Sequence, residues 1–503
     1  MLQIEFVLVA LCVVDVLFAG NVLLGGMHAS RSHLASMLPL GLRIAKDDHV
    51  VHFVESFSDE PSTYPANLTA HHFRTPTNAA HKLQLTSGGW RRSVSPDVLR
   101  ELFSVGDDAF LNMQKHYPRK IAELLDAKWD LTIIDELFGM SMYGLAAYHY
   151  ERNGTPYIIH STSTMLHCFG WKLGLGRPLH HRPSMWFPHS DNLRYDVVKF
   201  RMRLRSTAHA LATIFGIDFM TQHFSIKGIE QIGVKNFKFD KFWIEQAYNF
   251  HDDLEHFAFP APVSNEVKHI GRFCQKPNAL NDEFRVFMED PRSQGTIFIA
   301  LGTNVAWEYA PTYIINAFFD AFSALNEYRI IFAYNGQKPN RTIGAHVKLV
   351  PWCPQVDILN HNSTKLFITH GGMKSLREAI CSGTPLIVLP LAAEQTLNGA
   401  GVLEMGIGQV LNKFTLTARK LESAMREVIG NDTYKRNSAR FNRMYLDTPI
   451  PEMDQASFYA NRTIRLGSRK STFRIEGANL SWSTRLLVHE ISLFALLTAV
   501  LSQ

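Results

Sequence analysis

Residues Val350 to Asn398 read VPWCPQVDILNHNSTKLFITHGGMKSLREAICSGTPLIVLPLAAEQTLN, and this stretch decides the fold class. The apolar run Leu366 to Ile368 predicts a buried strand, and Met373 to Ser382 carry good helix formers. Gly383 is placed to end that helix, and Leu386 to Leu389 predict a second strand. A strand, a helix and a strand in this order predict a βαβ unit of a parallel sheet.

The turn His370-Gly371-Gly372 joins the first strand to the helix. Such a Gly-rich turn presents backbone N–H groups at a helix N-terminus, which binds anions and phosphate above all. Ser375 and Glu378 fit S-x-x-E, which is either a capping box or a pair that contacts a phosphate and a polyol. Lys374 is either a solvated side chain or a contact to a bound anion, because a cation in the first turn is otherwise disfavoured by about 0.3–1 kcal/mol.

The same pattern of apolar strands and small-residue turns recurs in both halves of the 503-residue chain. Further strands are predicted at residues 22–24, 50–54, 131–134, 156–159, 330–333 and 347–350, and residues 295–303 predict a strand that ends in a small-residue turn. A helix is predicted over 34–45, and helix-leaning segments from 177 to 255. We therefore predict an α/β fold with two doubly wound, Rossmann-like domains facing a cleft. The predicted ranges are 1–20 for a signal peptide, 21–273 and 282–455 for the two domains, 456–485 for a C-terminal helical segment and 486–503 for an apolar tail.

Composition limits the functional classes. The formal charge of +5, from 51 basic and 46 acidic residues, is too balanced to indicate nucleic-acid binding. The 23 histidines and five cysteines show no spacing typical of a metal site, and the cysteines are too few for a dense disulfide framework. We expect no metal site, and we expect two hydrophobic cores to stabilise the fold.

The ends of the chain carry targeting features. The apolar stretch Phe6 to Ala19 resembles a secretory signal peptide, although Asp15 interrupts it and no basic residue precedes it. The sequons agree with a secretory route and a glycoprotein, and they lie at Asn67, Asn153, Asn340, Asn362, Asn431, Asn461 and Asn479. Ile491 to Leu501 is apolar but shorter than the ~20 residues of a full span. A short membrane anchor, a buried helix and an interfacial helix all stay open for this tail.

Three motifs together carry a resemblance to a known family. W-x-P-Q at Trp352 to Gln355, F-I-T-H-G-G at Phe367 to Gly372 and E-Q-x-x-N at Glu394 to Asn398 resemble the signature of the UDP-glycosyltransferases. That family includes animal glucuronosyltransferases and nematode relatives. Shorter matches extend the resemblance over nearly the whole chain, at R-S-H (31–33), W-D-L-T-I-I-D (129–135), H-I-G (269–271) and A-L-G-T (300–303). The resemblance implies the GT-B arrangement, in which the N-terminal domain takes the acceptor and the C-terminal domain the UDP-sugar.

The resemblance also implies roles for residues of the C-terminal half. Trp352 would stack on uracil and Gln355 would help to hold the nucleoside. Glu378 would bind the ribose, and Glu394 with Gln395 would bind the sugar. The implied diphosphate contacts are Thr303, His370, Gly371, Gly372, Lys374 and Ser375. A buried aromatic and a plain loop amide are the alternatives for Trp352 and Gln355.

In the N-terminal half, the resemblance implies a catalytic pair. His33 matches the family's base, and its place at a helix start is expected to keep the ring neutral. Asp135, at the carboxyl end of a predicted strand, matches the aspartate that orients it, with Glu136 as the fallback. Ser32 beside His33 suggests a serine hydrolase, but no G-x-S-x-G turn supports that interpretation.

The implied activity is inverting transfer of glucuronic acid or another hexose from a UDP-sugar to a hydroxyl of a small lipophilic acceptor. It needs no cofactor beyond the UDP-sugar co-substrate, and it implies the endoplasmic reticulum lumen, with membrane association through the tail. The family usually has Asn at Lys374 and Asp at Glu394, so the donor sugar stays open. The alternative is a catalytically silent homologue that binds a nucleotide or lipophile, or modulates a partner.

Overall fold

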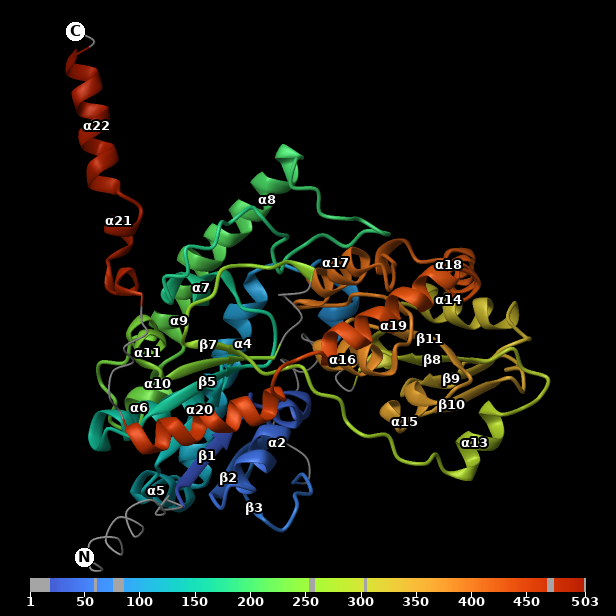
Figure 1. Cartoon of the computed structure of the whole chain (residues 1–503), viewed down its shortest axis with the longest axis horizontal. Coiled ribbons are helices and arrows are strands. Elements are labelled where there is room, and N and C mark those ends of the chain that lie inside the picture. The colour runs from blue at the N-terminus through green and yellow to red at the C-terminus, as the bar shows by residue number, and fades with distance from the viewer. Residues whose placement is uncertain are drawn as a thin grey trace, which may run out of the picture.

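In the computed structural model of the chain, two lobes each surround a parallel sheet (Figure 1). The structure describes residues 19–57, 61–75, 86–252, 258–302, 305–467 and 475–501. The predicted signal segment lies outside these ranges except for its last two residues, and so does Thr303.

The first lobe holds a seven-stranded sheet in the order β3-β2-β1-β4-β5-β6-β7. Its strands are β1 (Asn21–Gly25), β2 (Val50–Phe57), β3 (Leu68–Arg74), β4 (Leu131–Asp135), β5 (Tyr157–Ser161), β6 (Tyr248–His251) and β7 (Val267–His269). Its helices are α2 (Arg31–Ala45), α4 (Asp97–His116), α5 (Pro118–Asp126), α6 (Met140–Asn153), α7 (His167–Lys172), α8 (Phe200–Leu211), the π-helical η1 (Ala212–Ile217), α9 (Asp218–Phe224), α10 (Lys227–Gln231) and α11 (Phe239–Glu245).

The second lobe holds a six-stranded sheet in the order β10-β9-β8-β11-β12-β13. Its strands are β8 (Thr296–Ala300), β9 (Arg329–Ala333), β10 (Val347–Val350), β11 (Thr364–Thr369), β12 (Leu386–Val388) and β13 (Gly408–Val410). The chain continues through α13 (Asp282–Met288), η2 (Trp307–Tyr309), α14 (Thr312–Ser323), α15 (Gln355–Asn360), α16 (Met373–Ser382), α17 (Gln395–Met405), η3 (Lys413–Thr415), α18 (Ala418–Gly430), α19 (Asp432–Leu446), α20 (Glu452–Leu466), η4 (Glu476–Asn479), α21 (Trp482–Arg485) and α22 (Val488–Leu501).

Both sheets reverse their winding direction at the strand that comes first in the chain. β1 pairs in parallel with β2 on one side and with β4 on the other, and β8 pairs likewise with β9 and β11. This confirms the predicted doubly wound α/β domains. Ligands of such sheets bind beyond the carboxyl ends of the strands at this reversal, so the residues after β1, β4, β8 and β11 form the candidate site.

The sequence predicted some element bounds correctly and others wrongly. Helix α16 begins at Met373 and ends at Ser382 as predicted, with Gly383 in the left-handed conformation at φ 61°. The capping-box interpretation is wrong, because Gly372 is the N-cap and the helix start has no side-chain cap hydrogen bond. The predicted helix-leaning region becomes extensively helical only from Phe200, and β6 lies inside it.

A helical segment at residues 86–91 attaches the first lobe to the second. Its Trp90 is 1% exposed and belongs to the hydrophobic core of the second lobe. The ring centroids of Trp90 and Trp307 lie 5.0 Å apart, and the Trp90 indole N–H donates to the Ala306 carbonyl at 3.0 Å. The first lobe therefore contributes a core residue to the second.

Lys413 strengthens the same junction. Its Nζ donates to the carbonyls of Gly89, Arg92 and Leu391 at 2.6, 2.8 and 2.5 Å. Burial lowers the pKa of Lys413 to about 7. The carbonyls of Gly89 and Arg92 come from the first lobe, so this side chain bridges the domains.

The C-terminal part of the chain returns to the first lobe. α20 lies across that lobe in Figure 1, and its Ala456 and Ala460 are part of the first-lobe core around α2. The predicted boundary between 455 and 456 falls inside this helix. A disulfide between Cys274 and Cys381 joins the interdomain linker to α16, with a Cα–Cα distance of 5.6 Å, and the sequence did not predict this pairing.

Helix α22 projects from the molecule and has no buried residue. Within the described ranges, no helix is both long enough and apolar enough to cross a membrane.

Candidate functional site

His33 and Asp135 meet at the carboxyl edge of the first sheet. His33 is in the first turn of α2, where the N-cap Ser30 side chain accepts a hydrogen bond from its backbone N–H. Asp135 is the last residue of β4 and is fully buried. His33 Nδ1 lies 2.8 Å from Asp135 Oδ2, as the predicted pair requires.

This hydrogen bond assigns the tautomer of His33. The carboxylate accepts only, so Nδ1 carries the proton and Nε2 keeps a free lone pair. Burial lowers the pKa of His33, but the charge and the hydrogen bond of Asp135 outweigh it, so the pKa lies above its usual value. The helix start was expected to favour the neutral ring, whereas the Asp135 carboxylate acts in the opposite direction.

Thr162 completes this group and was not predicted. Its hydroxyl lies 2.7 Å from His33 Nδ1 and 3.3 Å from Asp135 Oδ1, so it holds both side chains in place. Thr162 directly follows β5, the neighbour of β4, so its place at a strand end was a signal in the sequence. The fallback residue Glu136 is instead bonded to Ser163 at 2.9 Å.

The turn between β11 and α16, the predicted anion site, is closely packed around its glycines and His370. Gly371 has φ 88°, and a Cβ there would lie 2.6 Å from Val388 Cγ1. His370 lies between two glycines, since a Cβ at Gly302 or at Gly372 would come within 2.9 Å of its ring. Burial lowers the pKa of His370 to about 4, so the neutral ring offers an N–H donor at pH 7.

Two of the predicted nucleoside contacts, Gln355 and Glu378, meet beside this turn. Gln355, in the first turn of α15, donates to Ser375 Oγ at 3.2 Å and to Glu378 Oε2 at 2.6 Å. Burial raises the pKa of the Glu378 carboxyl, and Lys374 and Gln355 oppose that rise. Trp352 is 71% exposed, so the interpretation as a core aromatic is wrong.

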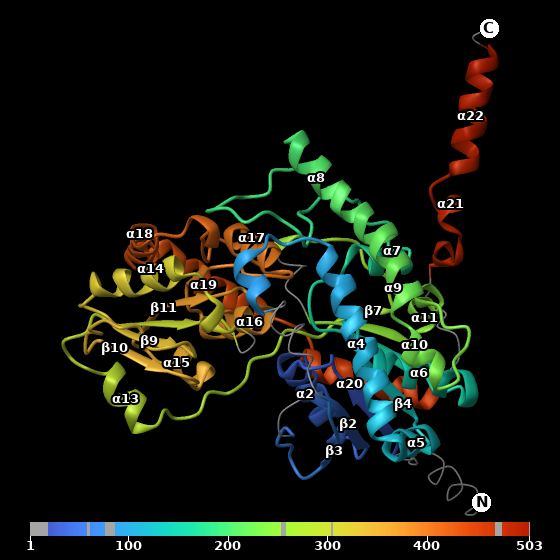
Figure 2. The same cartoon turned by 180° about the vertical axis from the view of Figure 1, so that it is seen from behind.

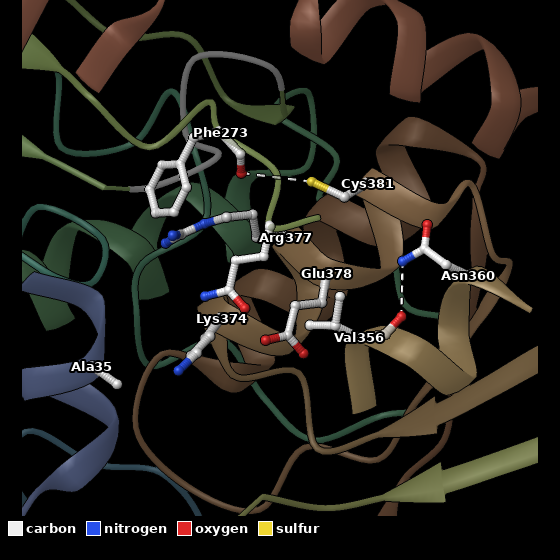
Figure 3. A pocket seen from close by; sticks show the side chains of 9 residues that line it. Ala35, Phe273, Val356, Asn360, Lys374, Arg377, Glu378 and Cys381 are labelled. Atoms are coloured by element: carbon white, nitrogen blue, oxygen red, sulfur yellow. Dashed lines mark hydrogen bonds between the residues drawn. The ribbon is translucent and has the colours of Figure 1, made fainter. Parts of the chain in front are cut away.

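Lys374 and Glu378 point into a pocket between the lobes (Figure 3). Ala35 of α2 lines the opposite side, and Lys374 extends toward it. Burial lowers the pKa of Lys374, while the Glu378 carboxylate acts to raise it. Lys374 is thus a half-buried cation facing the first lobe.

Arg377 of α16 is paired with Asp252, which follows β6 of the first lobe. Both side chains are at least 93% buried, and the guanidinium also lies 4.3 Å above the Phe273 ring. The Asp252 carboxylate is close enough to act on both His33 and Lys374 electrostatically. This pair was not predicted from the sequence, in which its partners are 125 residues apart.

Glu394 precedes α17 and faces the first lobe. Burial raises the pKa of its carboxyl, and the electrostatic interaction with His33 opposes that rise. Gln395 uses Oε1 to accept from the backbone N–H groups of Leu391 and Ala392 at 2.8 and 2.9 Å, which holds the loop in shape. Asn398 donates to the Gly371 carbonyl at 2.8 Å and so supports the Gly-rich turn.

Among the described residues, no group of three or more His, Cys, Asp or Glu side chains could hold a metal ion.

Comparisons with known proteins point to one family. The family model described as "UDP-glucoronosyl and UDP-glucosyl transferase" matches residues 194–502. Human UDP-glucuronosyltransferase 2A3 is 33% identical over 230 residues, which is 45% of this chain and 42% of the relative. Human UDP-glucuronosyltransferase 2B17 is 31% identical over 247 residues, 48% of this chain and 44% of the relative. The chain thus spans less than half the length of these relatives.

Solved structures share the fold over most of the chain. The glycotransferase of kitacinnamycin matches with a TM-score of 0.59 and 14% identity, covering 88% of this chain and 99% of that one. Phytolacca americana UGT2, complexed with UDP-2fluoro-glucose and pterostilbene, matches with a TM-score of 0.55 and 16% identity, covering 88% and 100%. At these identities the likeness establishes the GT-B fold alone.

Proposed function

Because the chain belongs to the UDP-glucoronosyl and UDP-glucosyl transferase family, we propose that it is an inverting UDP-glycosyltransferase. The donor is a UDP-sugar carrying glucuronic acid or another hexose. The acceptor is a small lipophilic molecule with a hydroxyl group.

One observation carries the proposal. The His33–Asp135 pair at the edge of one sheet faces Glu394, which belongs to the Gly-rich edge of the other sheet. A base and an anion-binding turn on opposite sides of one cleft suit a reaction that joins a hydroxyl to a nucleotide-bound sugar.

In the proposed mechanism, His33 Nε2 removes the proton of the acceptor hydroxyl. The acceptor oxygen forms a bond to the anomeric carbon while the bond from that carbon to the UDP oxygen breaks. The electron pair leaves with UDP, and its negative charge is met by His370, Ser375, Lys374 and the turn amides. Asp135 stabilises the imidazolium that forms, and the inverted sugar keeps all its other bonds.

The nucleoside would lie along α15 and α16. Trp352 would stack on the uracil, and Glu378, released from Gln355, would accept hydrogen bonds from the ribose. Glu394 would bind sugar hydroxyls, whereas Gln395 would shape the loop, since its carbonyl oxygen is already bonded to backbone. Thr303 is retained as a proposed diphosphate contact.

The names of the relatives support glucuronic acid as the first donor to test. We place the protein in the lumen of the endoplasmic reticulum and propose that α22 associates with its membrane. A library of lipophilic hydroxyl compounds, screened by mass spectrometry with UDP-glucose and UDP-glucuronate, identifies the pair that reacts.

The alternative is a silent homologue that binds nucleotide or lipophile without turnover. The orientation of His33 by both Asp135 and Thr162 disfavours it, because a binding protein has no use for an oriented base. Nucleotide-dependent thermal stabilisation with no donor consumed would support this alternative.

The decisive variant is His33→Ala. We expect loss of transfer by about 10²–10⁴-fold, because the proton acceptor is removed. UDP affinity should stay within about twofold, since His33 belongs to the opposite lobe from the nucleotide residues. Isothermal titration with UDP and a transfer assay measure the two quantities, and parallel loss of both would contradict the role of His33.

A further inference from the structure

An exposed apolar stripe runs along one continuous helical segment of the first lobe, formed by α8, η1 and α9. Its members are Phe200 (65% exposed), Leu204 (55%), Leu211 (39%), Phe215 (41%) and Phe219 (58%). They are separated by four, seven, four and four residues, so they share one helical face roughly 30 Å long. The side that packs against the lobe carries Ser206, Ala210, Thr213 and Ile214 instead.

Basic side chains flank this stripe. Helix α8 has arginines at 201, 203 and 205 and no acidic residue. Arg201 and Arg205 are exposed, whereas Arg203 donates to the carbonyls of Val197 and Val198 at 2.8 and 2.7 Å. Exposed apolar side chains beside two exposed arginines are typical of a helix that lies in the interface of an anionic membrane.

The stripe is tied to the base of α22. The Phe215 and Trp171 ring centroids lie 6.2 Å apart. Arg485, which ends α21, donates to the Trp171 carbonyl and lies 5.5 Å from the Trp171 ring. In both Figure 1 and Figure 2, α8 and α22 project from the same side of the molecule. Trp171 thus links the stripe to the segment before α22, and the two exposed apolar helices, α8 and α22, project in the same direction.

We propose that the stripe from Phe200 to Phe219 docks on an anionic lipid bilayer. The apolar side chains enter the acyl boundary, and Arg201 and Arg205 contact the lipid headgroups. A second copy of the chain fits less well, because pairing two such helices would bring their basic flanks together without an acidic residue of α8 to balance them. Whereas the proposed association of α22 attaches the chain at one end, the stripe also fixes the orientation of the first lobe on the membrane.

The test is vesicle flotation of the full chain, with variants that separate the two surfaces. The tail variant is Leu493→Ser, Phe494→Ser and Leu497→Ser, and the stripe variant is Phe200→Ser, Leu204→Ser and Phe219→Ser. The matched control changes three exposed apolar residues elsewhere, Val286→Ser, Met444→Ser and Phe458→Ser. All changed positions are exposed, so circular dichroism and the melting temperature should stay as in the parent.

The stripe changes and the control changes are each added to the tail variant. On vesicles of phosphatidylcholine with phosphatidylserine, we expect the tail variant with the stripe changes to bind at least about tenfold more weakly than the tail variant alone. The tail variant with the control changes should bind these vesicles within about twofold of the tail variant alone. Arg201→Gln or Arg205→Gln should lower binding about fivefold on these vesicles and leave it unchanged on pure phosphatidylcholine. These results would hold whether or not the protein transfers a sugar, so they are independent of the proposed function.

Equal binding of the stripe and control variants would overturn the proposal, as would a failure of the tail variant to float at all. Sedimentation equilibrium tests whether a second copy of the chain covers the stripe instead of a membrane. A concentration-dependent mass that the stripe changes abolish would assign the stripe to a second copy of the chain and would also overturn membrane docking.

Discussion

Among the charged groups around His33, Asp135 has the largest effect on its pKa. Asp135 holds the Nδ1 proton and raises the pKa of the ring against the effect of burial. This neighbour therefore has two consequences: it aims Nε2 at the cleft, and it moves the titration of the base to higher pH. The same carboxylate also accepts from the backbone N–H of Met27, which ties the loop after β1 to the pair.

The rate of transfer should accordingly rise with pH. Only the neutral ring accepts a proton, and the pKa of the ring lies above the usual ~6.5. The midpoint of the acidic limb in the pH profile of kcat/KM should therefore lie above ~6.5 as well. Asp135→Asn removes the charge that raises the pKa, so the limb should move to lower pH while the maximal rate falls by about 10²–10⁴-fold. A pH profile of both proteins checks this, and a limb that stays in place would contradict it.

Trp352 offers the clearest separation of binding from folding. Its ring is 71% exposed, so Trp352→Ala should change the free energy of unfolding by less than about 0.5 kcal/mol. Loss of stacking on a base costs about 1–3 kcal/mol, so the Kd for UDP should rise about 5–100-fold. Titration calorimetry measures this, with Phe458→Ala as the control at an exposed aromatic residue on α20.

The position of a side chain in the fold could be predicted where it follows a strongly apolar strand. Asp135 and His370 stand directly at the ends of the apolar runs that form β4 and β11. Thr162 has the same position after β5 but was missed, because a threonine after a strand is common and no motif singles it out. Gln395 matches the family motif, yet its carbonyl oxygen serves the backbone of its own loop, which only the three-dimensional structure reveals.

At the scale of elements, the turn from β11 into α16 depends on two glycines that act differently. Gly371 needs its positive φ of 88°, a conformation that other residues rarely adopt. Gly372 has an ordinary backbone, but a Cβ there would lie 2.6 Å from His370 Nε2. One glycine therefore maintains the backbone and the other makes room for a side chain.

The two alanine variants should separate these effects. Gly371→Ala should lower the free energy of unfolding by about 1–3 kcal/mol, since it meets Val388 and strains the backbone. Gly372→Ala should be nearly neutral for folding but should displace His370 and weaken UDP binding. Chemical denaturation and UDP titration distinguish them, and equal effects on folding would show that the two glycines have the same role.

Elements could be predicted where residues that begin or end them are recognisable in the sequence. The bounds of α16 follow from Gly372 and Gly383, whose effect on the backbone is independent of distant contacts. Strands β3, β6, β7 and β13 were missed because they are short or carry several polar residues, and their strand conformation depends on pairing with a neighbour. A short stretch of sequence does not contain the neighbouring strand with which it pairs.

At the scale of the whole molecule, contacts between distant residues fix how the lobes meet. Trp90 enters the core of the second lobe, and Arg377 pairs with Asp252 across the cleft. The two doubly wound domains could be predicted, because each repeats a local pattern. Their junction could not, because each contact pairs residues more than a hundred positions apart.

Trp90→Ala tests whether the junction stabilises the second lobe. Loss of a buried tryptophan costs about 3–5 kcal/mol, and the cavity would lie in the second lobe although the change is in the first. We expect a lower melting temperature with an earlier separate transition. A double-mutant cycle with Trp307→Ala should give a coupling of about 0.5–3 kcal/mol, and additive effects would argue against direct packing.

Helix α20 has a consequence for how such chains can recombine. It follows the second lobe in sequence, yet its Ala456 and Ala460 lie in the core of the first, and Arg43 of α2 is bonded to its Asp454 at 2.6 Å. A chimera that exchanges everything after the linker would bring a foreign α20 against a native α2. Exchangeable modules therefore have two breakpoints, one in residues 274–281 and one between α19 and α20, as if the second lobe were an insertion in the first.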